Sequence, residues 1–200
     1  MTNILNAIDI VVFDFDSTLI KEESLDELSK FLGKSEDVSR LTNLGMEGKI
    51  SFKESLHKRL ALINPTKKNI EEFLASSSLH SSDGIDVLLT WLFEKNKKVY
   101  IISGGFKFAI IPFALEYGIP IKNIYCNDFI IDSNDKFILD EDKFTCQDNG
   151  KLEALKNLLE ENYPGTDIKE SGKRVIVIGD GITDSNLCPP AGYFFAFLDY

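Results

Sequence analysis

The stretch Ile8-Asp9-Ile10-Val11-Val12-Phe13-Asp14-Phe15-Asp16-Ser17-Thr18 decides the fold of this chain. It begins as a mostly apolar, β-rich run, which is typical of a strand buried on both faces, and it ends in acidic and polar residues. Similar apolar runs follow at 98–102, 124–126 and 174–178, with a weaker one at 193–197. Helical patterns separate these runs at 85–93, at 106–117 (interrupted by Pro112) and at 151–161. Strands that alternate with helices predict an α/β fold with a parallel sheet and helical crossovers.

The segment 22–78 breaks this alternation, because its apolar residues recur only at helical spacing. Several consecutive helices after the first strand predict a small helical cap inserted into the α/β core. We place this cap at 19–83 and the core at 1–18 and 84–200. A second, smaller insertion is expected at 129–139, where two short β-like runs flank the turn sequence Asp132-Ser133-Asn134-Asp135 and predict a hairpin.

Composition excludes several classes of protein. The chain has 200 residues and a formal net charge of −10, which argues against nucleic acid or an anionic membrane as the main partner. No apolar run approaches the roughly 20 residues that span a bilayer, and the N-terminus lacks the basic region of a signal peptide. Three cysteines without metal-ligand spacing indicate reduced thiols. We therefore expect a cytoplasmic protein, either a monomer or a homodimer.

Polar residues follow three of the predicted strands. Asp14 and Asp16 end the first, Ser103-Gly104-Gly105 ends the second, and Gly179-Asp180-Gly181-Ile182-Thr183-Asp184 ends the fourth. In an open parallel sheet the ligand crevice lies beyond the carboxyl ends of the strands, so these segments should meet there. Carboxylates at close range repel one another, and a hard cation resolves that conflict. Few carboxylates together with a phosphate suit Mg²⁺.

This pattern predicts the transfer of a phosphoryl group to a carboxylate. Asp14 would attack phosphorus and form an aspartyl-phosphate, while Asp16 would protonate the leaving alcohol and then activate water. A phosphate ester is an anion, so positive charge must offset its repulsion of the nucleophile. Mg²⁺, Lys151 and the backbone N–H groups of Gly104-Gly105 would supply this charge. Ser103 would donate a hydrogen bond to a phosphate oxygen.

The chain resembles the haloacid dehalogenase superfamily. The four motifs of that family are matched in order by Asp14-x-Asp16-x-Thr18, Ser103, Lys151 and Gly179-Asp180-Gly181-x-x-Asp184. The resemblance implies a Rossmann-like core with a mobile cap. It also implies a Mg²⁺ ion held by Asp14, the backbone carbonyl of Asp16, and Asp180, with Asp184 close to the metal. It further implies another helix and strand after the 193–197 run, where this chain stops at Tyr200, and we expect a chain without them to be less stable.

The resemblance narrows to the members of this superfamily that hydrolyse O-phosphoserine, and it covers nearly the whole chain. The similar segments are 14–28, 46–63, 101–106 and 188–190. By this resemblance Glu23 would bind the substrate ammonium group and Arg59 its carboxylate, while Met46 and Phe52 would line the pocket. The residues support Arg59 independently, because it shares the apolar face of a helix with Phe52 and a charge there needs an anionic partner. A carboxylate gripped in a bidentate manner is a suitable partner.

Simpler interpretations stay open at each position. The acidic residues at the strand ends are also typical of helix caps, and the glycines there are also typical of a tight turn. Lys151 and Glu23 suit solvated helix starts, Arg59 suits a pair with a structural acid such as Glu23, and Met46 and Phe52 suit the core of the cap. Two other functions remain as alternatives. One is the same chemistry, or phosphoryl transfer, on another small phosphorylated metabolite, and the other is a catalytically silent binding module.

Overall fold

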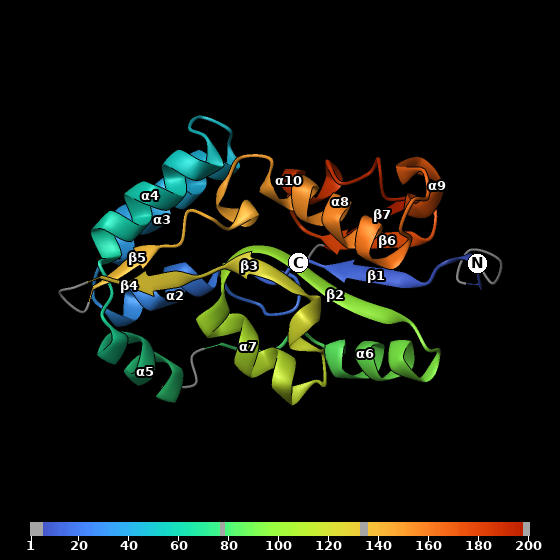
Figure 1. Cartoon of the computed structure of the whole chain (residues 1–200). Coiled ribbons are helices and arrows are strands. Elements are labelled where there is room, and N and C mark those ends of the chain that lie inside the picture. The colour runs from blue at the N-terminus through green and yellow to red at the C-terminus, as the bar shows by residue number, and fades with distance from the viewer. Residues whose placement is uncertain (1–5, 77–78, 133–135, 198–200) are drawn as a thin grey trace.

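A five-stranded parallel sheet forms the centre of the protein (Figure 1). The computed structural model describes residues 6–76, 79–132 and 136–197, apart from the side chain of Met46. The strand order is β3-β2-β1-β6-β7, and all four neighbouring pairs are parallel. The strands are β1 (Ile10–Phe13), β2 (Lys98–Phe106), β3 (Ile124–Asn127), β6 (Val175–Gly179) and β7 (Tyr193–Ala196). The predicted α/β class is therefore confirmed.

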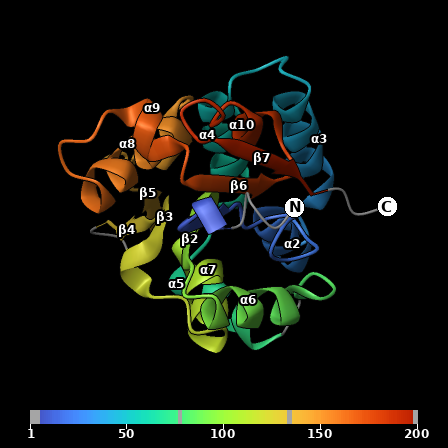
Figure 2. The same ribbon diagram turned by 90° about the vertical axis from the view of Figure 1, so that its right-hand side faces the viewer.

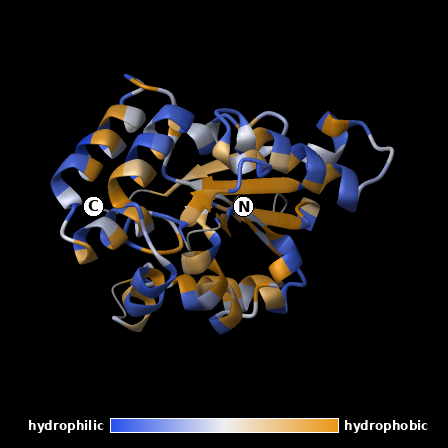
Figure 3. Ribbon diagram, turned by 60° about the vertical axis from the view of Figure 1, so that its left-hand side comes forward, coloured by the Kyte–Doolittle hydropathy of each residue, from blue (hydrophilic) through white to orange (hydrophobic). Residues whose placement is uncertain are grey.

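Helices cover both faces of this sheet, because its central strand β1 is apolar on both sides. Val11 and Phe13 point into one hydrophobic cluster, and Ile10 and Val12 point into another. Figure 2 shows helices on both sides of the sheet, and Figure 3 shows the apolar strands between these layers. The covering helices are α6 (Ile85–Glu94) and α7 (Lys107–Glu116) on the first face, and α8 (Gly150–Asn162) and α9 (Ile168–Gly172) on the second.

Four helices lie between β1 and α6 in the chain, as the apolar stripes of this segment predict. They are α2 (Ser24–Phe31), α3 (Ser35–Met46), α4 (Phe52–Ile63) and α5 (Lys67–Ala75). They bury a hydrophobic cluster of their own, which includes Leu28, Leu56 and Phe73 and is closed by Phe106 from the core sheet. In Figure 1, α3 and α4 lie beyond the carboxyl ends of the strands. We call this four-helix insertion the cap.

The second insertion forms the expected hairpin. Strands β4 (Phe129–Ile131) and β5 (Phe137–Leu139) pair antiparallel, and an isolated bridge joins Lys136 to Thr66 of the cap. The turn residues 133–135 lie outside the described residues. Two short 3₁₀ helices, η1 (Ile121–Asn123) and η2 (Phe144–Cys146), and one short α-helix, α10 (Ile182–Ser185), complete the elements.

Two details differ from the sequence-based expectation. Strand β2 does not end at Ile102 but continues to Phe106, with a register shift against β3 between these two residues. Helix α7 runs through Pro112 without a break.

The three cysteines are free thiols. Among the described helices, none has both the length and the apolar character needed to cross a membrane.

Candidate active site

A pocket of about 390 Å³ lies between the carboxyl ends of β1, β2 and β6 and the cap. Its walls contain almost all of the site residues that the sequence predicts. Those present are Asp14, Asp16, Glu23, Phe52, Arg59, Ser103, Gly104, Gly105, Lys151, Asp180 and Asp184. The side chain of Met46, which the sequence also places in the pocket, lies outside the described residues. One pocket thus unites residues from both parts of the chain.

The end of β1 positions the two aspartates of the first motif. Asp14 is 8% exposed, and its Oδ1 accepts a hydrogen bond of 2.7 Å from the backbone N–H of Phe15. The carboxylate of Asp16 accepts a bond of 2.9 Å from the N–H of Ser24, at the start of α2. Burial and the charge of Glu23 raise the pKa of Asp16 well above its ordinary value. The surroundings of Asp16 therefore shift this carboxyl group toward its protonated form.

Lys151 joins the nucleophile candidate to the fourth motif. Its Nζ donates to Asp14 Oδ2 at 2.8 Å and to Asp184 Oδ1 at 2.7 Å. Burial alone would lower the pKa of Lys151, but the two carboxylates outweigh burial and raise it, so the ammonium group is charged. The preceding Gly150 packs so tightly that a Cβ there would lie 1.8 Å from the carbonyl oxygen of Phe144. This contact fixes the start of α8, and with it the place of Lys151.

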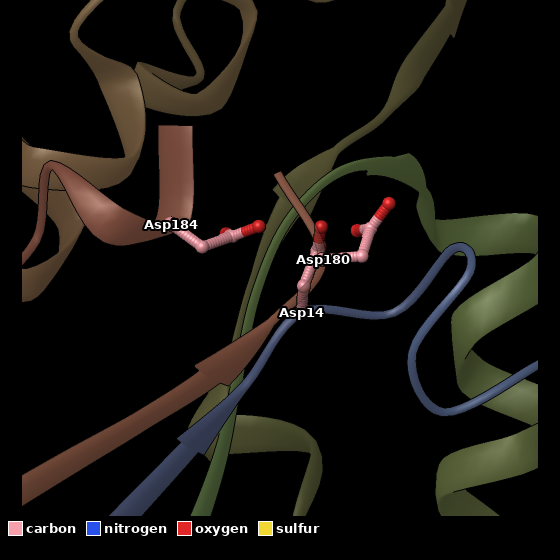
Figure 4. A group of neighbouring side chains, drawn as sticks. All are labelled: Asp14, Asp180 and Asp184. Atoms are coloured by element: carbon pink, nitrogen blue, oxygen red, sulfur yellow. The ribbon is translucent and has the colours of Figure 1, made fainter. Parts of the chain in front are cut away.

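Three carboxylates form an acidic cluster, which we define as Asp14, Asp180 and Asp184 (Figure 4). One oxygen from each lies within 4.8 Å of the other two. Asp184 is 1% exposed and reaches the cluster because residue 179 is glycine, whose Cβ would otherwise lie 2.4 Å from Asp184 Cγ. Three carboxylate oxygens at this spacing form a donor set that fits a hard divalent cation. Within the described residues, the side chain of Asp16 is not part of this set.

The cluster is electrostatically strained without a cation. Loss of hydration and repulsion from Asp14 raise the pKa of Asp180 to about 7, although its side chain remains exposed to solvent. Loss of hydration and Asp14 also raise the pKa of Asp184 to about 6, against the opposing effect of Lys151. A bound cation would remove this repulsion, which is an electrostatic reason to expect one here.

The end of β2 forms the opposite wall. Ser103 is buried, and its Oγ accepts a hydrogen bond of 2.9 Å from the N–H of Gly105. A Cβ at Gly105 would lie 2.7 Å from Asp16 Oδ2, and one at Gly104 would lie 2.7 Å from the ring of Phe52. The lack of a side chain at Gly105 therefore lets the Asp16 carboxylate approach the backbone, and the lack of one at Gly104 lets Phe52 of the cap do so.

The cap contributes one anionic and one cationic group. Glu23 accepts a hydrogen bond of 2.8 Å from the hydroxyl of Ser17, and burial raises the pKa of Glu23. Arg59 is 7% exposed, and burial lowers its pKa. The Nε of Arg59 has no hydrogen-bond partner within the described part of the chain. A buried donor without a partner is costly, so this guanidinium is suited to an anionic ligand.

Sequence reasoning missed the residues that support Arg59. Its Nη1 donates to the hydroxyl of Thr42 at 3.3 Å and lies 3.9 Å from Asp26, so Asp26 is a second acid close to Arg59 besides Glu23, whose charge also acts on this guanidinium. Thr42 also lines the pocket. These two partners come from two other helices, α2 and α3, and no local spacing in the sequence indicates them.

A second group that sequence reasoning missed connects the cap to the core. The N–H of Lys53 donates to Asp148 at 2.9 Å, and its Nζ donates to Gln147 at 2.9 Å. Glu141 lies within 3.4 Å of the Lys53 ammonium and 3.0 Å of His57. These contacts hold the start of α4 against the loop that precedes α8.

Comparisons with known proteins agree with this geometry. A family model described as haloacid dehalogenase-like hydrolase matches residues 11–187. Phosphoserine phosphatase from Bos taurus is 37% identical over 198 residues, which cover 98% of this chain and 84% of the relative. The Homo sapiens phosphoserine phosphatase is 38% identical over 190 residues, which cover 94% and 81%.

Solved structures give the same result. A phosphoserine phosphohydrolase-like protein from Francisella tularensis superposes with a TM-score of 0.78 at 38% identity, covering 96% of this chain and 88% of the other. A phosphoserine phosphatase with a phospho-aspartyl intermediate analogue superposes with a TM-score of 0.80 at 26% identity, covering 95% and 86%.

Proposed function

The chain belongs to the haloacid dehalogenase-like hydrolase family, and from that premise we propose that it hydrolyses O-phosphoserine to serine and phosphate. One observation carries the proposal. Asp14, which directly follows β1, accepts a hydrogen bond from Lys151, and the same pocket contains the buried Arg59, whose Nε has no partner among the described residues. The first pair suits phosphoryl transfer, and the arginine suits a substrate that also carries a carboxylate.

Asp14 is the proposed nucleophile. The N–H of Phe15 holds one oxygen of Asp14, and Lys151 holds the other, so the carboxylate is oriented before substrate arrives. Attack on phosphorus would form an aspartyl-phosphate and release the serine oxygen. Because the Lys151 ammonium is charged and buried, it offsets negative charge that develops on the phosphoryl oxygens.

Asp16 is the proposed general acid and base. Its raised pKa favours the protonated form, which is required for donating a proton to the leaving serine oxygen. The carboxylate that remains would then take a proton from the water that cleaves the aspartyl-phosphate. The N–H of Ser24 holds Asp16 in place through both steps.

A divalent cation, which we propose is Mg²⁺, fits the acidic cluster. Asp14, Asp180 and the backbone carbonyl of Asp16 would hold it, with Asp184 close by. When bound, Mg²⁺ would neutralise charge on the cluster and polarise the phosphoryl group. The raised pKa values of Asp180 and Asp184 support this assignment, because they reflect repulsion that a cation relieves.

The phosphate and serine portions of the substrate would contact different walls. Ser103 accepts a bond from Gly105, which leaves its hydroxyl hydrogen free to donate to a phosphate oxygen. The amide groups of Gly104 and Gly105 would complete this phosphate site. In the cap, Arg59 would bind the carboxylate and Glu23 the ammonium group. Phe52 and, by family resemblance, Met46 would enclose the carbon atoms between them.

Further parts of the proposal concern the whole chain. We propose that residues 19–83 act as a cap domain over a core of 1–18 and 84–200. We also propose that the protein acts in the cytoplasm in serine biosynthesis, as a monomer or homodimer. The net charge of −10 supports a role without a nucleic-acid or membrane partner.

The decisive experiment is a substrate panel with and without Mg²⁺. The panel contains O-phosphoserine, O-phosphoethanolamine (which lacks the carboxylate), glycerol phosphate and p-nitrophenyl phosphate. We expect kcat/KM for O-phosphoserine to exceed that for O-phosphoethanolamine at least tenfold, because the loss of one charge-assisted hydrogen bond has roughly this effect. Equal rates on all four esters would reject the specific substrate and favour a broad phosphatase.

A matched variant tests the chemistry. Asp14→Asn keeps the shape of the side chain but removes the nucleophile, so turnover of every ester should disappear while the protein still folds, because Lys151 keeps Asp184 as its partner. Absence of turnover in the wild-type protein under all conditions would instead support a silent binding module.

A further inference from the structure

Three cap helices meet at a buried polar network behind the pocket. Asp26 comes from α2, Thr42 from α3 and Arg59 from α4. The Thr42 hydroxyl is 2.7 Å from Asp26 Oδ1 and 3.3 Å from Arg59 Nη1. Thr42 and Arg59 are each 7% exposed. Thr42 and Arg59 are among the residues that line the pocket, whereas Asp26 lies behind them.

The direction of these hydrogen bonds is fixed by chemistry. A threonine hydroxyl has one hydrogen to donate and two lone pairs that accept. The carboxylate of Asp26 can only accept, and the short distance assigns the Thr42 hydrogen to it rather than to the carbonyl of Val38 at 3.3 Å. The lone pairs of Thr42 therefore face Arg59 Nη1, which can only donate.

The inserted hydroxyl keeps Asp26 from occupying the guanidinium. Asp26 Oδ1 is 3.9 Å from Arg59 Nη1, which is beyond hydrogen-bonding distance. A direct bidentate pair would use two N–H groups of Arg59 and cancel its charge locally. Here one N–H is bound through Thr42, and Nε remains without a partner in the described part of the chain.

We propose that Thr42, oriented by Asp26, is a positioning residue that holds the Arg59 guanidinium so that its remaining N–H groups face the carboxylate of the substrate. This inference rests on the proposed function. It adds two residues that act through Arg59 and determine selectivity for esters that carry a carboxylate. It does not require Asp26 to touch the substrate.

The test compares O-phosphoserine with O-phosphoethanolamine in the Mg²⁺-loaded protein. Thr42→Val keeps the shape of the side chain but removes the acceptor for Arg59. We expect KM for O-phosphoserine to rise about tenfold, the scale of one such hydrogen bond, with kcat reduced less than twofold. Kinetics with O-phosphoethanolamine should stay within twofold of wild type, because this ester has no carboxylate. Thr42→Ser restores the hydroxyl and should restore KM.

Ser29→Ala is the matched control for lost stability. Ser29 is also a buried cap hydroxyl, but it donates to the backbone carbonyl of Asp26 and does not contact Arg59. It should lower the melting temperature by an amount similar to Thr42→Val without a change of selectivity.

Each outcome decides one question. Equal losses for both esters in Thr42→Val, or no loss for either, would overturn the positioning role. A shift of KM in Ser29→Ala as large as in Thr42→Val would also overturn the positioning role, since it would show that any destabilisation of the cap raises KM. If the wild-type protein does not prefer O-phosphoserine over O-phosphoethanolamine, the proposed substrate fails, and that failure is visible before any variant is made.

Discussion

Replacing Lys151 by methionine is expected to destabilise the metal-free protein in a manner that depends on pH. The substitution keeps the length of the side chain but removes the ammonium group that binds Asp14 at 2.8 Å and Asp184 at 2.7 Å. All three side chains are largely buried, so the charges left behind are poorly solvated. Removing one partner of a buried ion pair costs about 3–5 kcal/mol.

Protonation of Asp184 limits this loss and sets its pH dependence. In the wild-type protein the pKa of Asp184 is about 6, and Lys151 is one of the groups that hold it down. Without Lys151 the pKa rises further, so between pH 6 and 8 the folded variant keeps a proton that the unfolded chain has released. A folded state that binds more protons loses stability as the pH rises, by about 1.4 kcal/mol per unit. We expect a destabilisation of about 3 kcal/mol at pH 8 and less than about 1 kcal/mol at pH 6.

Thermal unfolding in EDTA at pH 6, 7 and 8 measures this effect. For a chain of this size, 3 kcal/mol corresponds to a melting temperature lower by about 6–12 °C. Lys156→Met on the same helix is the control, because Lys156 pairs with Glu153 at the surface and should matter by less than about 0.5 kcal/mol at every pH. A Lys151→Met protein as stable as wild type at pH 8, or a loss that is the same at all three pH values, would refute the reasoning.

Three other predictions follow from contacts in and beside the pocket. Gly105→Ala should lower kcat more than about tenfold with little loss of stability, because its Cβ would lie 2.7 Å from Asp16 Oδ2 and displace that carboxylate. Steady-state kinetics measure the loss of kcat and a melting curve measures the stability, and a fully active variant would contradict this prediction. Mg²⁺ should raise the melting temperature more at pH 8 than at pH 5.5, because protons compete for Asp180, whose pKa is raised to about 7; an equal rise at both pH values in a thermal-shift titration would count against a carboxylate site. Gly150→Ala should destabilise by more than about 2 kcal/mol, because its Cβ would lie 1.8 Å from the carbonyl oxygen of Phe144; urea unfolding measures this, and a neutral result would mean that η2 can move away.

Strand ends were the most predictable part of this protein. An apolar run followed by Asp14 marks both a buried strand and its polar exit, and the parallel sheet then brings such exits together by topology alone. The extension of β2 to Phe106 was not predicted, because Ser103-Gly104-Gly105 has a turn-like composition. Backbone pairing with β3 resumes at Phe106 after the register shift, and this tertiary contact overrides the local preference.

The cap was predictable as helices but not as a binding surface. Helical spacing placed Arg59 on the apolar face of its helix, and the structure buries it. The partners of Arg59 were not predictable, because they lie on other helices, and the spacing of residues within one helix does not determine which residues of a neighbouring helix it meets. Glu23 illustrates the same limit: it precedes α2 and would suit a solvated helix start, yet it lines the pocket and accepts a hydrogen bond from Ser17.

Because the Phe52 ring contacts Gly104, substitutions at these two positions, which are distant in the sequence, depend on one another. Phe52 belongs to the cap and Gly104 to the core sheet, and the ring occupies the space in which a Cβ at residue 104 would stand. A mutation that adds a side chain at 104 would therefore be tolerated only with a smaller residue at 52, and a smaller residue at 52 would open room at 104. Among relatives the two positions should accordingly covary, with changes in pocket size arising as paired exchanges rather than single ones.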